Sequence, residues 1–153
     1  MESYSPFSNT NISDLTALDL EILKSVNEGW YVEYKSELNN SQSIAKSISS
    51  FANSYGGWLF YGIKEKDKAD NTAGSFPGIP KSEVDAALQT IRHSVARHLN
   101  PIPHFDTKIV EGPESGIELA KDHVVICIYV PFSIVAPHIH ARGCIYRRVA
   151  DSS

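Results

Sequence analysis

Residues 44–62 read IAKSISSFANSYGGWLFYG, and more of the fold follows from this stretch than from any other. Its first half predicts an amphipathic helix, because apolar residues recur at helical spacing. The apolar stripe consists of Ile44, Ile48, Phe51 and Tyr55. Gly56 and Gly57 follow where that helix should end, since glycine readily adopts the positive φ of a helix terminus. Residues 58–63 are mostly apolar and predict a strand in the middle of a sheet.

Segments on both sides of this stretch add further elements. Asp14 is a candidate N-cap for a helix with apolar positions at Leu15, Leu18, Ile22 and Val26. Another helix is predicted to begin at Ser82, and residues 64–80, charged and then rich in Gly and Pro, predict a loop. Strands are predicted over residues 30–35, 105–110, 123–130 and 144–149.

These elements predict the fold class. Helices and strands mix without a strict βαβ repeat, so we expect an α/β (α+β) single domain in which a mixed β-sheet packs with about three helices. Residues 1–13 lack apolar periodicity and predict a flexible N-terminal segment. The folded domain is therefore expected to span residues 14–153.

The composition limits the classes of function. The chain has 153 residues, with 14 Lys+Arg against 18 Asp+Glu and a formal charge of -4. This balance excludes a strongly basic protein that coats nucleic acid. No apolar run approaches the roughly 18 residues that span a bilayer, so no membrane partner is expected. Cys127 and Cys144 form no CxxC pair, which favours a reduced, cytoplasmic protein.

Glu28 and Glu33 are the first candidates for chemistry. A spacing of five residues places two strand side chains on opposite faces, so these two converge only if Gly29 turns the chain. Two converging carboxylates with a third acid nearby would bind Mg²⁺ or Mn²⁺, which prefer oxygen ligands and can stabilise phosphoryl transfer. The alternative is structural: Glu33 and Lys35 would face solvent on the strand, and Glu28 would be an ordinary loop acid.

The C-terminal residues 137–153, PHIHARGCIYRRVADSS, are the second candidate. Guanidinium groups and an aromatic ring suit phosphates and stacked bases, which predicts a nucleic-acid-binding strand. The residues concerned are Arg142, Tyr146, Arg147 and Arg148. Strand alternation would place Arg147 and Arg148 on opposite faces. A basic turn that only faces solvent is the alternative.

The same run contains a partial set of zinc ligands. His138, His140 and Cys144 have side chains that coordinate zinc. A structural zinc site takes four protein ligands, and the sequence shows no convincing fourth. We therefore expect no zinc.

Taken together, these segments resemble the Schlafen-type AlbA-like domain. The family pattern begins with E-x-x-x-x-E-[FY]-K, which fits residues 28–35, and continues with a helix ending in S-x-F-A-N-[ST]-x-G-G, which fits residues 49–57. The motifs G-[VI], P-H and Y-x-R-V followed by two serines fall on residues 62–63, 137–138 and 146–153. The resemblance covers roughly residues 18–153.

The resemblance implies both a ligand and an activity. Vertebrate Schlafen proteins carry paired copies of this domain in a U-shaped clamp that cleaves tRNA and rRNA, with a metal held by three acids. Those acids fall on Glu28, Glu33 and Glu65, where Glu65 stands in place of the usual aspartate. The expected function is a nucleic-acid-binding domain with divalent-metal-dependent endoribonuclease chemistry on structured RNA such as tRNA. The three acids would hold Mg²⁺ or Mn²⁺, and Lys35 would neutralise developing charge.

Two other functions remain open at this level. A non-catalytic module would bind DNA or RNA, or regulate a larger protein, through the basic C-terminal strand, with the acids structural. A dimerisation domain would use its apolar strands for assembly and bind no nucleic acid. The paired Schlafen arrangement implies a homodimer. Family members often continue into further domains, so fusion to such domains is also expected.

Overall fold

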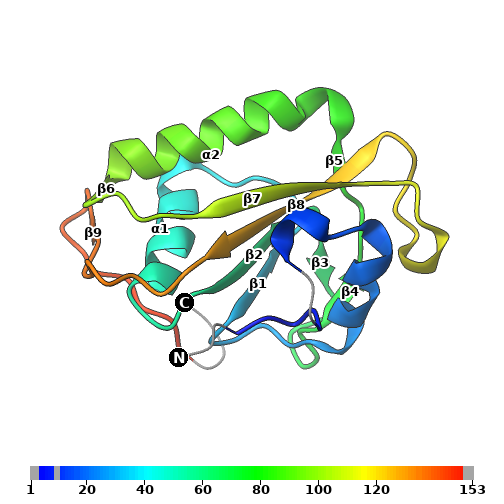
Figure 1. The fold of residues 1–153 in the computed structure, drawn as a ribbon, viewed down its shortest axis with the longest axis horizontal. Helices are drawn as coiled ribbons and strands as arrows, with labels where there is room; N and C mark the ends of the chain where they lie inside the picture. Colours follow the sequence, from blue (N-terminus) through cyan, green and yellow to red (C-terminus); the bar gives the residue numbers. More distant parts are fainter. Residues whose placement is uncertain (1–3, 9–10, 150–153) are drawn as a thin grey trace.

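A five-stranded mixed sheet forms the centre of the structure (Figure 1), a computed structural model that describes residues 4–8 and 11–149. Its strands are β1 (Val32–Lys35), β2 (Gly57–Tyr61), β5 (Ile79–Pro80), β7 (Asp106–Glu111) and β8 (His123–Val130). β1 runs parallel to β2, and β2 pairs antiparallel with β8. β8 also pairs antiparallel with β5 and β7, so this long apolar strand connects the whole sheet.

Each face of the sheet carries its own apolar core, because side chains alternate along the strands. The helices are α1 (Ser41–Ala52), α2 (Val84–His98) and the 3₁₀ helices η1 (Ile12–Asp14) and η2 (Ala17–Ser25). On β2, Leu59 and Tyr61 pack with α1 and α2. Trp58 and Phe60 pack on the opposite face with η1 and η2. The predicted fold class, a mixed β-sheet packed with about three helices in one α+β domain, is confirmed.

The predicted N-terminal α-helix is wrong in its type and in its buried stripe. The segment forms η1 and η2, and Leu18 and Ile22, predicted inside, are exposed. The buried residues of η2 are Ala17, Leu20 and Leu23. This spacing of three follows from the three residues per turn of a 3₁₀ helix. η2 begins after Thr16, which forms a capping box with Asp19.

Several short strands also differ from the prediction. The expected loop 64–80 contains β3 (Lys64–Glu65), β4 (Ala73–Ser75) and β5. The expected strand at 144–149 does not form, and β6 (Leu99–Asn100) pairs with β9 (Ile139–His140) instead. β1 begins two residues later than predicted, and Tyr55 lies beyond the end of α1. The remaining 3₁₀ turns are η3 (Lys81–Glu83) and η4 (Ser115–Ile117).

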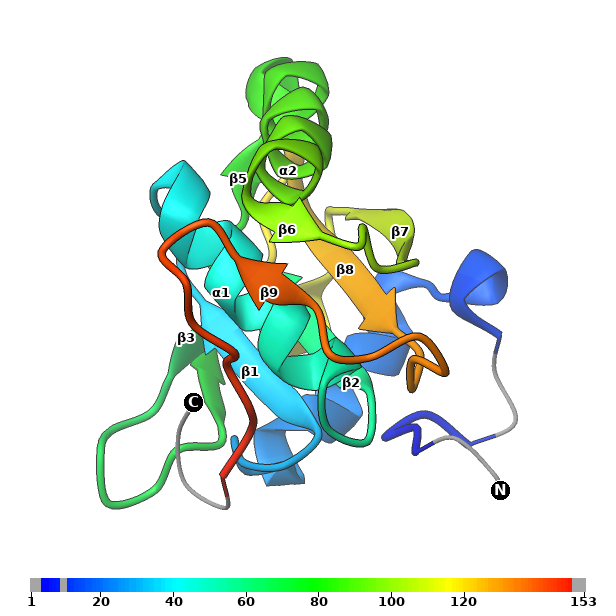
Figure 2. The ribbon, with the colours of Figure 1, turned by 90° about the vertical axis from the view of Figure 1, so that its left-hand side faces the viewer.

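Beside the short β6–β9 pairing, side-chain hydrogen bonds hold residues 138–148, the C-terminal segment, across α1 (Figure 2). Asn53, the C-cap of α1, donates from Nδ2 to the carbonyl oxygens of His138 and Tyr146, both at 3.0 Å. Its Oδ1 accepts the backbone N–H of His138 at 2.7 Å. Further along, the backbone N–H of Arg148 donates to Ser54 Oγ at 2.8 Å. These bonds bring residues 146–148 beside β1.

Two stretches predicted from sequence are described only in part. Of residues 1–13, predicted to be flexible, 1–3 and 9–10 lie outside the described residues, and Phe7 is buried with its ring edge-on to Trp58 and Phe60. The C-terminal motif is described as far as Val149. Within the described part of the chain, no helix has the length and apolarity that crossing a membrane requires.

Candidate active site

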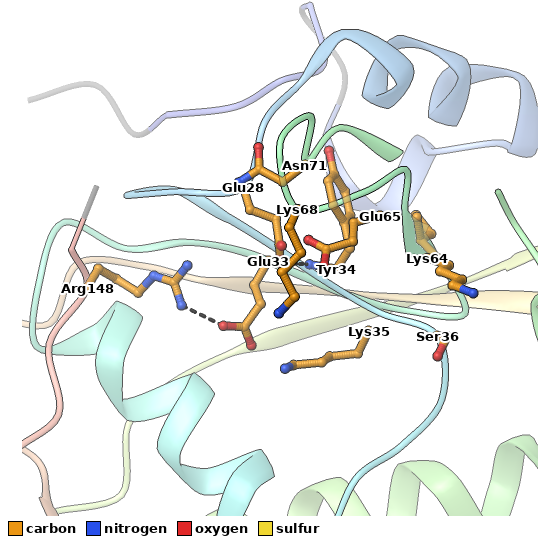
Figure 3. A pocket seen from close by; sticks show the side chains of 11 residues that line it. Glu28, Glu33, Tyr34, Lys35, Ser36, Lys64, Glu65, Lys68, Asn71 and Arg148 are labelled. Carbon is orange, nitrogen blue, oxygen red and sulfur yellow. Dashed lines mark hydrogen bonds and ion pairs between the residues drawn. The ribbon is translucent and has the colours of Figure 1, made fainter. Parts of the chain in front are cut away.

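The candidate active site is a pocket of about 460 Å³ beside β1 (Figure 3). Its charged lining residues are Glu28, Glu33, Lys35, Lys64, Glu65, Lys68 and Arg148. The structure therefore brings the three predicted acids to one place, although they come from different segments of the chain. Three lysines and one arginine line the same pocket, so basic side chains surround the three acids.

A turn at Gly29 places the first acid beside the strand, as the spacing of five residues required. The backbone N–H of Gly29 donates to the carbonyl oxygen of Val32 at 3.0 Å, so the chain reverses just before β1. The backbone N–H of Tyr34 donates to Oε2 of Glu28 at 2.9 Å. Glu28 is thus held by the backbone of the strand that carries Glu33.

Glu28 and Glu65 form a carboxyl pair in this pocket. Burial and a hydrogen bond shared with Glu65 raise the pKa of Glu28, and the charges of Glu65 and Glu33 add to the effect. The N–H of Tyr34 opposes this change, but the pKa still reaches about 7. Two carboxyl groups that share a hydrogen bond need a proton between them. Glu28 is therefore a carboxyl group that exchanges its proton near neutral pH.

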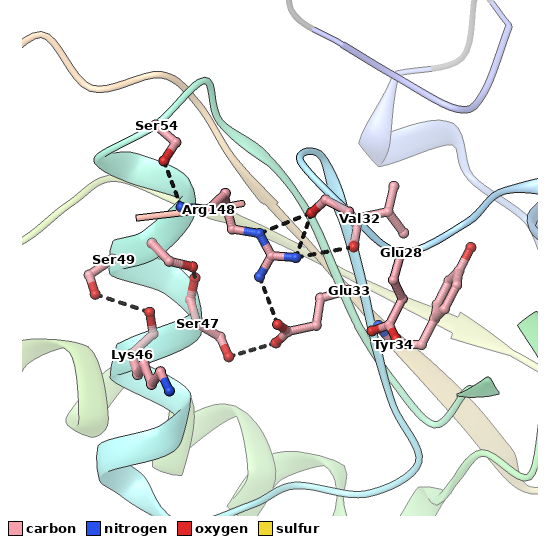
Figure 4. Close-up of polar contacts among 11 residues, drawn as sticks. Glu28, Val32, Glu33, Tyr34, Lys46, Ser47, Ser49, Ser54 and Arg148 are labelled. Carbon is pink, nitrogen blue, oxygen red and sulfur yellow. Dashed lines mark hydrogen bonds and ion pairs between the residues drawn. The ribbon is translucent and has the colours of Figure 1, made fainter. Parts of the chain in front are cut away.

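Glu33 lies in the same pocket but is bound by the protein (Figure 4). Nη1 of Arg148 donates to its Oε1 at 2.7 Å, and Ser47 Oγ donates to its Oε2 at 2.6 Å. The Arg148 side chain is 1% exposed, and that of Glu33 is 6% exposed. The guanidinium group also donates from Nε and Nη2 to the carbonyl oxygen of Gly29 and lies 4.3 Å from the Phe51 ring centroid.

These contacts determine the ionisation of Glu33. Burial opposes its charged form, but the Arg148 charge and the hydrogen bonds from Ser47 and Arg148 outweigh it, with help from the charge of Lys35. Together they hold the pKa of Glu33 below the ordinary glutamate value. Glu33 is therefore a buried, ionised and fully engaged carboxylate.

Of the three predicted acids, Glu28 and Glu65 are the two whose carboxyl groups could serve as ligands of a divalent cation. Glu28 and Glu65 present their carboxyl groups to each other, and once deprotonated these groups supply the oxygen ligands that Mg²⁺ and Mn²⁺ prefer. Glu33 directs its oxygens to Arg148 and Ser47 instead. Consistently, within residues 4–8 and 11–149 no three His, Cys, Asp or Glu side chains are grouped so as to hold a metal ion.

The two adjacent arginines predicted to bind nucleic acid point in different directions. Arg148 points inward and its guanidinium group forms a buried ion pair with Glu33. It is therefore not accessible to a phosphate at the surface. Arg147 is exposed, and its Nη1 donates to the carbonyl oxygen of Asn53 at 3.1 Å. The predicted placement on opposite sides is thus observed, although the segment is not a strand.

Arg142 and Tyr146 lie over the N-terminal part of α1, away from the carboxyl pair. The exposed Arg142 donates to Oε1 of Gln42. Tyr146 is half-buried, with the ammonium group of Lys46 lying 5.2 Å from its ring centroid. These two predicted residues therefore belong to a surface on α1, separate from the pocket lining.

The three candidate zinc ligands do not converge. The His138 ring is hydrogen-bonded to Ser133 Oγ and to the carbonyl oxygen of Pro101. The Nε2 of His140 is hydrogen-bonded to the carbonyl oxygen of Gln42. Cys144 is an exposed free cysteine. The two imidazoles thus serve the packing of the C-terminal segment.

Ser47, Lys64 and Lys68 belong to the site but were not predicted from the sequence. Ser47 is a buried small polar residue on the helix face between apolar positions, and nothing in the local pattern marks it as a partner of Glu33. The two lysines could have been predicted as site residues from their position in the sequence. They follow the central strand in the run KEKDK, at residues 64–68, next to the predicted third acid.

The fold and the pocket define an α+β domain with a carboxyl pair and a buried ion pair beside the parallel strand. A family model described as Schlafen, AlbA_2 matches residues 28–153, which is most of the chain. The chain therefore belongs to the Schlafen AlbA_2 family, and the resemblance drawn from its motifs is confirmed. The match begins at Glu28, the first acid of the pocket.

Other comparisons are more distant. No curated protein matches the chain. Among solved structures, the chain is similar to the DIP2311 protein from Corynebacterium diphtheriae, with 21% sequence identity and a TM-score of 0.47. The match covers 80% of this chain and 21% of the other, so this chain spans about a fifth of the length of that protein.

Proposed function

We propose that this domain binds nucleic acid and cleaves structured RNA such as tRNA in a divalent-metal-dependent reaction. Membership of the Schlafen AlbA_2 family supports the broader part of this proposal, the binding of nucleic acid. The Glu28–Glu65 pair supports the reaction, because two neighbouring carboxyl groups in a lysine-lined pocket suit a divalent cation, which would displace their proton, and a phosphate together.

Each residue of the pocket has a role in this proposal. Glu28 and Glu65 would hold Mg²⁺ or Mn²⁺, which when bound would stabilise charge developing on the cleaved phosphodiester. Lys35, half-buried, and Lys68, exposed, would attract the phosphate and keep it beside the carboxyl pair. Glu33 is a positioning residue, since its ion pair with Arg148 holds β1 against the C-terminal segment.

A second candidate function is a binding module without catalysis. The observation that favours it is the engagement of Glu33, because the third acid could join a metal site only on release from Arg148 and Ser47. In that case the domain would hold nucleic acid through its exposed lysines and Arg147, and the carboxyl pair would be structural.

Incubation of the purified chain with end-labelled tRNA distinguishes the two candidates. Cleavage is measured with Mn²⁺, with Mg²⁺ and with EDTA, and binding is measured in parallel by fluorescence anisotropy of the labelled RNA. The variants are Glu28→Gln and Glu65→Gln. Glu83→Gln is the matched control, because Glu83 is an exposed acid on η3 outside the pocket.

The proposed reaction requires cleavage that EDTA, Glu28→Gln and Glu65→Gln abolish and Glu83→Gln retains. Tight binding without cleavage under any metal condition would instead establish the binding module. Absence of both cleavage and binding in the unmodified chain would overturn the proposal entirely.

A further inference from the structure

Four aromatic rings form a continuous chain on the surface next to the start of β1. Tyr4 stacks on Tyr31 with ring centroids 4.6 Å apart, and Tyr31 lies 6.4 Å from Tyr55. Trp30 completes the chain at 5.8 Å from Tyr55. Trp30 is 40% exposed and Tyr55 is 54% exposed, so these two neighbouring rings are open to solvent. Grouped exposed aromatic side chains are typical of interaction sites.

The sheet brings these rings together from separate segments. Trp30 and Tyr31 precede β1, while Tyr55 lies in the turn between α1 and β2 (Figure 2). β1 and β2 are parallel, and the backbone N–H of Trp58 donates to the carbonyl oxygen of Tyr31 at 2.7 Å. Gly56 shapes the intervening turn with a φ of +79°, and a Cβ there would lie only 2.7 Å from the carbonyl oxygen of Val130. The backbone therefore positions the rings independently of their own packing.

The apolar cores do not account for the exposed rings. Tyr55 was expected on the buried stripe of α1, but that stripe ends with Phe51, and Tyr55 lies outside the helix. The aromatic residues that do build the cores on β2 are Trp58 and Phe60 on one face and Tyr61 on the other. Among the described residues, 4–8 and 11–149, Trp30 and Tyr55 are thus accessible to a ligand.

Positive charge lies beside the exposed rings. Arg147 is exposed, with its guanidinium on the carbonyl oxygen of Asn53, two residues before Tyr55. The neighbouring Arg148 bonds to Gly29, the residue before Trp30. The C-terminal segment therefore contacts the chain just before each ring. Arg148 also lines the carboxylate pocket, so the residue before Trp30 is hydrogen-bonded to a residue of that pocket.

We propose that Trp30 and Tyr55 form a stacking platform for an unpaired nucleobase, with Arg147 contacting the adjoining phosphate. This inference rests on the proposed binding of nucleic acid. Any of the nucleobases can stack on an exposed aromatic ring, because each has a flat face, so this contact does not depend on the nucleotide sequence. A chain with a formal charge of -4 attracts a polyanion weakly as a whole, so contacts independent of salt are needed for affinity.

A platform of this kind directs the strand toward the carboxyl pair. Glu28 precedes Trp30 by two residues and is held by the backbone of β1, so the proposed platform and the pocket adjoin along the chain at the start of this strand. The ligand class is therefore a single-stranded stretch of RNA or DNA, such as a loop or an end. A regular duplex, whose bases are already stacked on one another, would not use the rings.

Intrinsic fluorescence reports on this platform directly. The chain has two tryptophans, and Trp58 is buried with its Nε1–H donating to the carbonyl oxygen of Tyr4. Single-stranded oligo-U and oligo-dT, and a duplex of the same length, are titrated while tryptophan emission and the anisotropy of a labelled strand are followed. The single strands should quench the emission and the duplex should not. Trp30→Phe identifies the quenched residue, because it removes the exposed indole.

Substitutions of the two rings test how much each contributes to the affinity for single-stranded nucleic acid. Trp30→Ala and Tyr55→Ala should each weaken single-strand binding by roughly 5- to 150-fold, the factor expected for one stacked base. Tyr55→Phe should keep the affinity, because the ring is retained. Ile134→Ala is the matched control, since Ile134 is 91% exposed in a different loop. The loss caused by Arg147→Ala should shrink as salt increases, whereas the loss caused by Tyr55→Ala should persist.

The failures of the platform and of the proposed function are distinguishable. Unchanged affinity in Trp30→Ala and Tyr55→Ala, with normal binding by anisotropy, overturns the platform and leaves nucleic-acid binding intact. A dimer by sedimentation that Trp30→Ala dissociates shows that a second copy covers the rings, and also overturns the platform. No binding of any strand by the unmodified chain overturns both the platform and the function on which it rests.

Discussion

Glu33 and Glu28 are the same residue type in the same pocket, yet the protein moves their pKa values in opposite directions. Both lose water, which disfavours charge. Glu33 recovers the loss from a buried guanidinium and a serine hydroxyl, so it is ionised. Glu28 meets another carboxyl group, Glu65, and its pKa reaches about 7. The partner, rather than burial, therefore decides which carboxyl group is structural and which can exchange its proton.

This difference divides the acid trio into two functional parts. A carboxylate already neutralised by a buried arginine stabilises the fold, because its charge is fully compensated. A carboxyl group that exchanges its proton near neutral pH can release that proton to solvent when a cation binds. The proposed chemistry therefore rests on Glu28 and Glu65, while Glu33 joins β1 to the C-terminal segment.

The largest expected effect comes from breaking the buried ion pair. Arg148→Ala leaves the Glu33 carboxylate buried without its cation, which should lower the free energy of unfolding by about 3–5 kcal/mol. Urea unfolding followed by circular dichroism measures the loss. Arg147→Ala is the control, because its side chain is exposed on the same segment. Equal losses in the two variants would show that Glu33 does not depend on its arginine.

Removing both charges should restore part of that stability. In the double variant Glu33→Gln/Arg148→Met no buried charge is left unpaired. Its loss should be smaller than the sum of the two single losses, by about 0.5–3 kcal/mol. The same unfolding measurement on all four proteins completes the cycle. Additive losses would contradict a direct interaction between the two side chains.

The carboxyl pair should show itself as a pH dependence of stability. The pKa of Glu28 is about 7 in the folded chain, above its ordinary value, so folding favours the protonated form. This stabilisation is present below about pH 4.5 and is lost as the pH rises through about 7. Glu28→Gln should therefore lose less stability than the unmodified chain between about pH 5 and 8, by urea unfolding. Parallel curves for the two proteins would contradict the pair.

Glu33 should change the pH dependence of stability in the opposite direction. Its pKa is lowered on folding, so its contribution is present above the unfolded glutamate pKa and is lost as the pH falls. Glu33→Gln should therefore flatten the acidic limb of the stability curve and leave the decline near neutral pH in place. A variant that flattens the neutral limb instead would reverse the assignment of the two glutamates.

The smallest effect on the free energy of unfolding is expected for an ion pair that, unlike Arg148–Glu33, is exposed to solvent. Lys81 Nζ lies 3.4 Å from Glu111 Oε2, and both side chains are more than half exposed. Lys81→Ala should change the unfolding free energy by less than about 1 kcal/mol, because exposed pairs are screened and flexible. A loss comparable to that of Arg148→Ala would mean that burial does not set the strength of these pairs.

Most of the fold was predictable because it depends on local periodicity. β8 has the predicted bounds, and the apolar stripe of α1 is buried as predicted at Ile44, Ile48 and Phe51. The errors lie where the local pattern is ambiguous. Leu15, Leu18 and Ile22 fit an α-helical period, but the segment packs with a period of three. Packing against the sheet decided between two helical geometries that the sequence alone did not separate.

The sequence predicted which acids lie in the candidate site, but it did not predict which side chains contact one another there. Glu28, Glu33 and Glu65 were all placed in one site, and the turn at Gly29 that this required is present. Arg147 and Arg148 were both candidate phosphate contacts on opposite faces, and alternation does not say which of the two points inward. Which of the two points inward depends on where α1 and β1 lie, and no local pattern contains that information.

The sequence by itself determined the longer elements of the sheet and its two α-helices, the family and the set of charged groups, because each follows from spacing within a few dozen residues. The tertiary structure alone decided which charges meet. Arg148 reaches Glu33 across 115 residues of chain, and Asn53 holds the segment that carries it. A pKa and an ion pair depend on distances of a few ångströms, and only the folded chain sets such distances between remote residues.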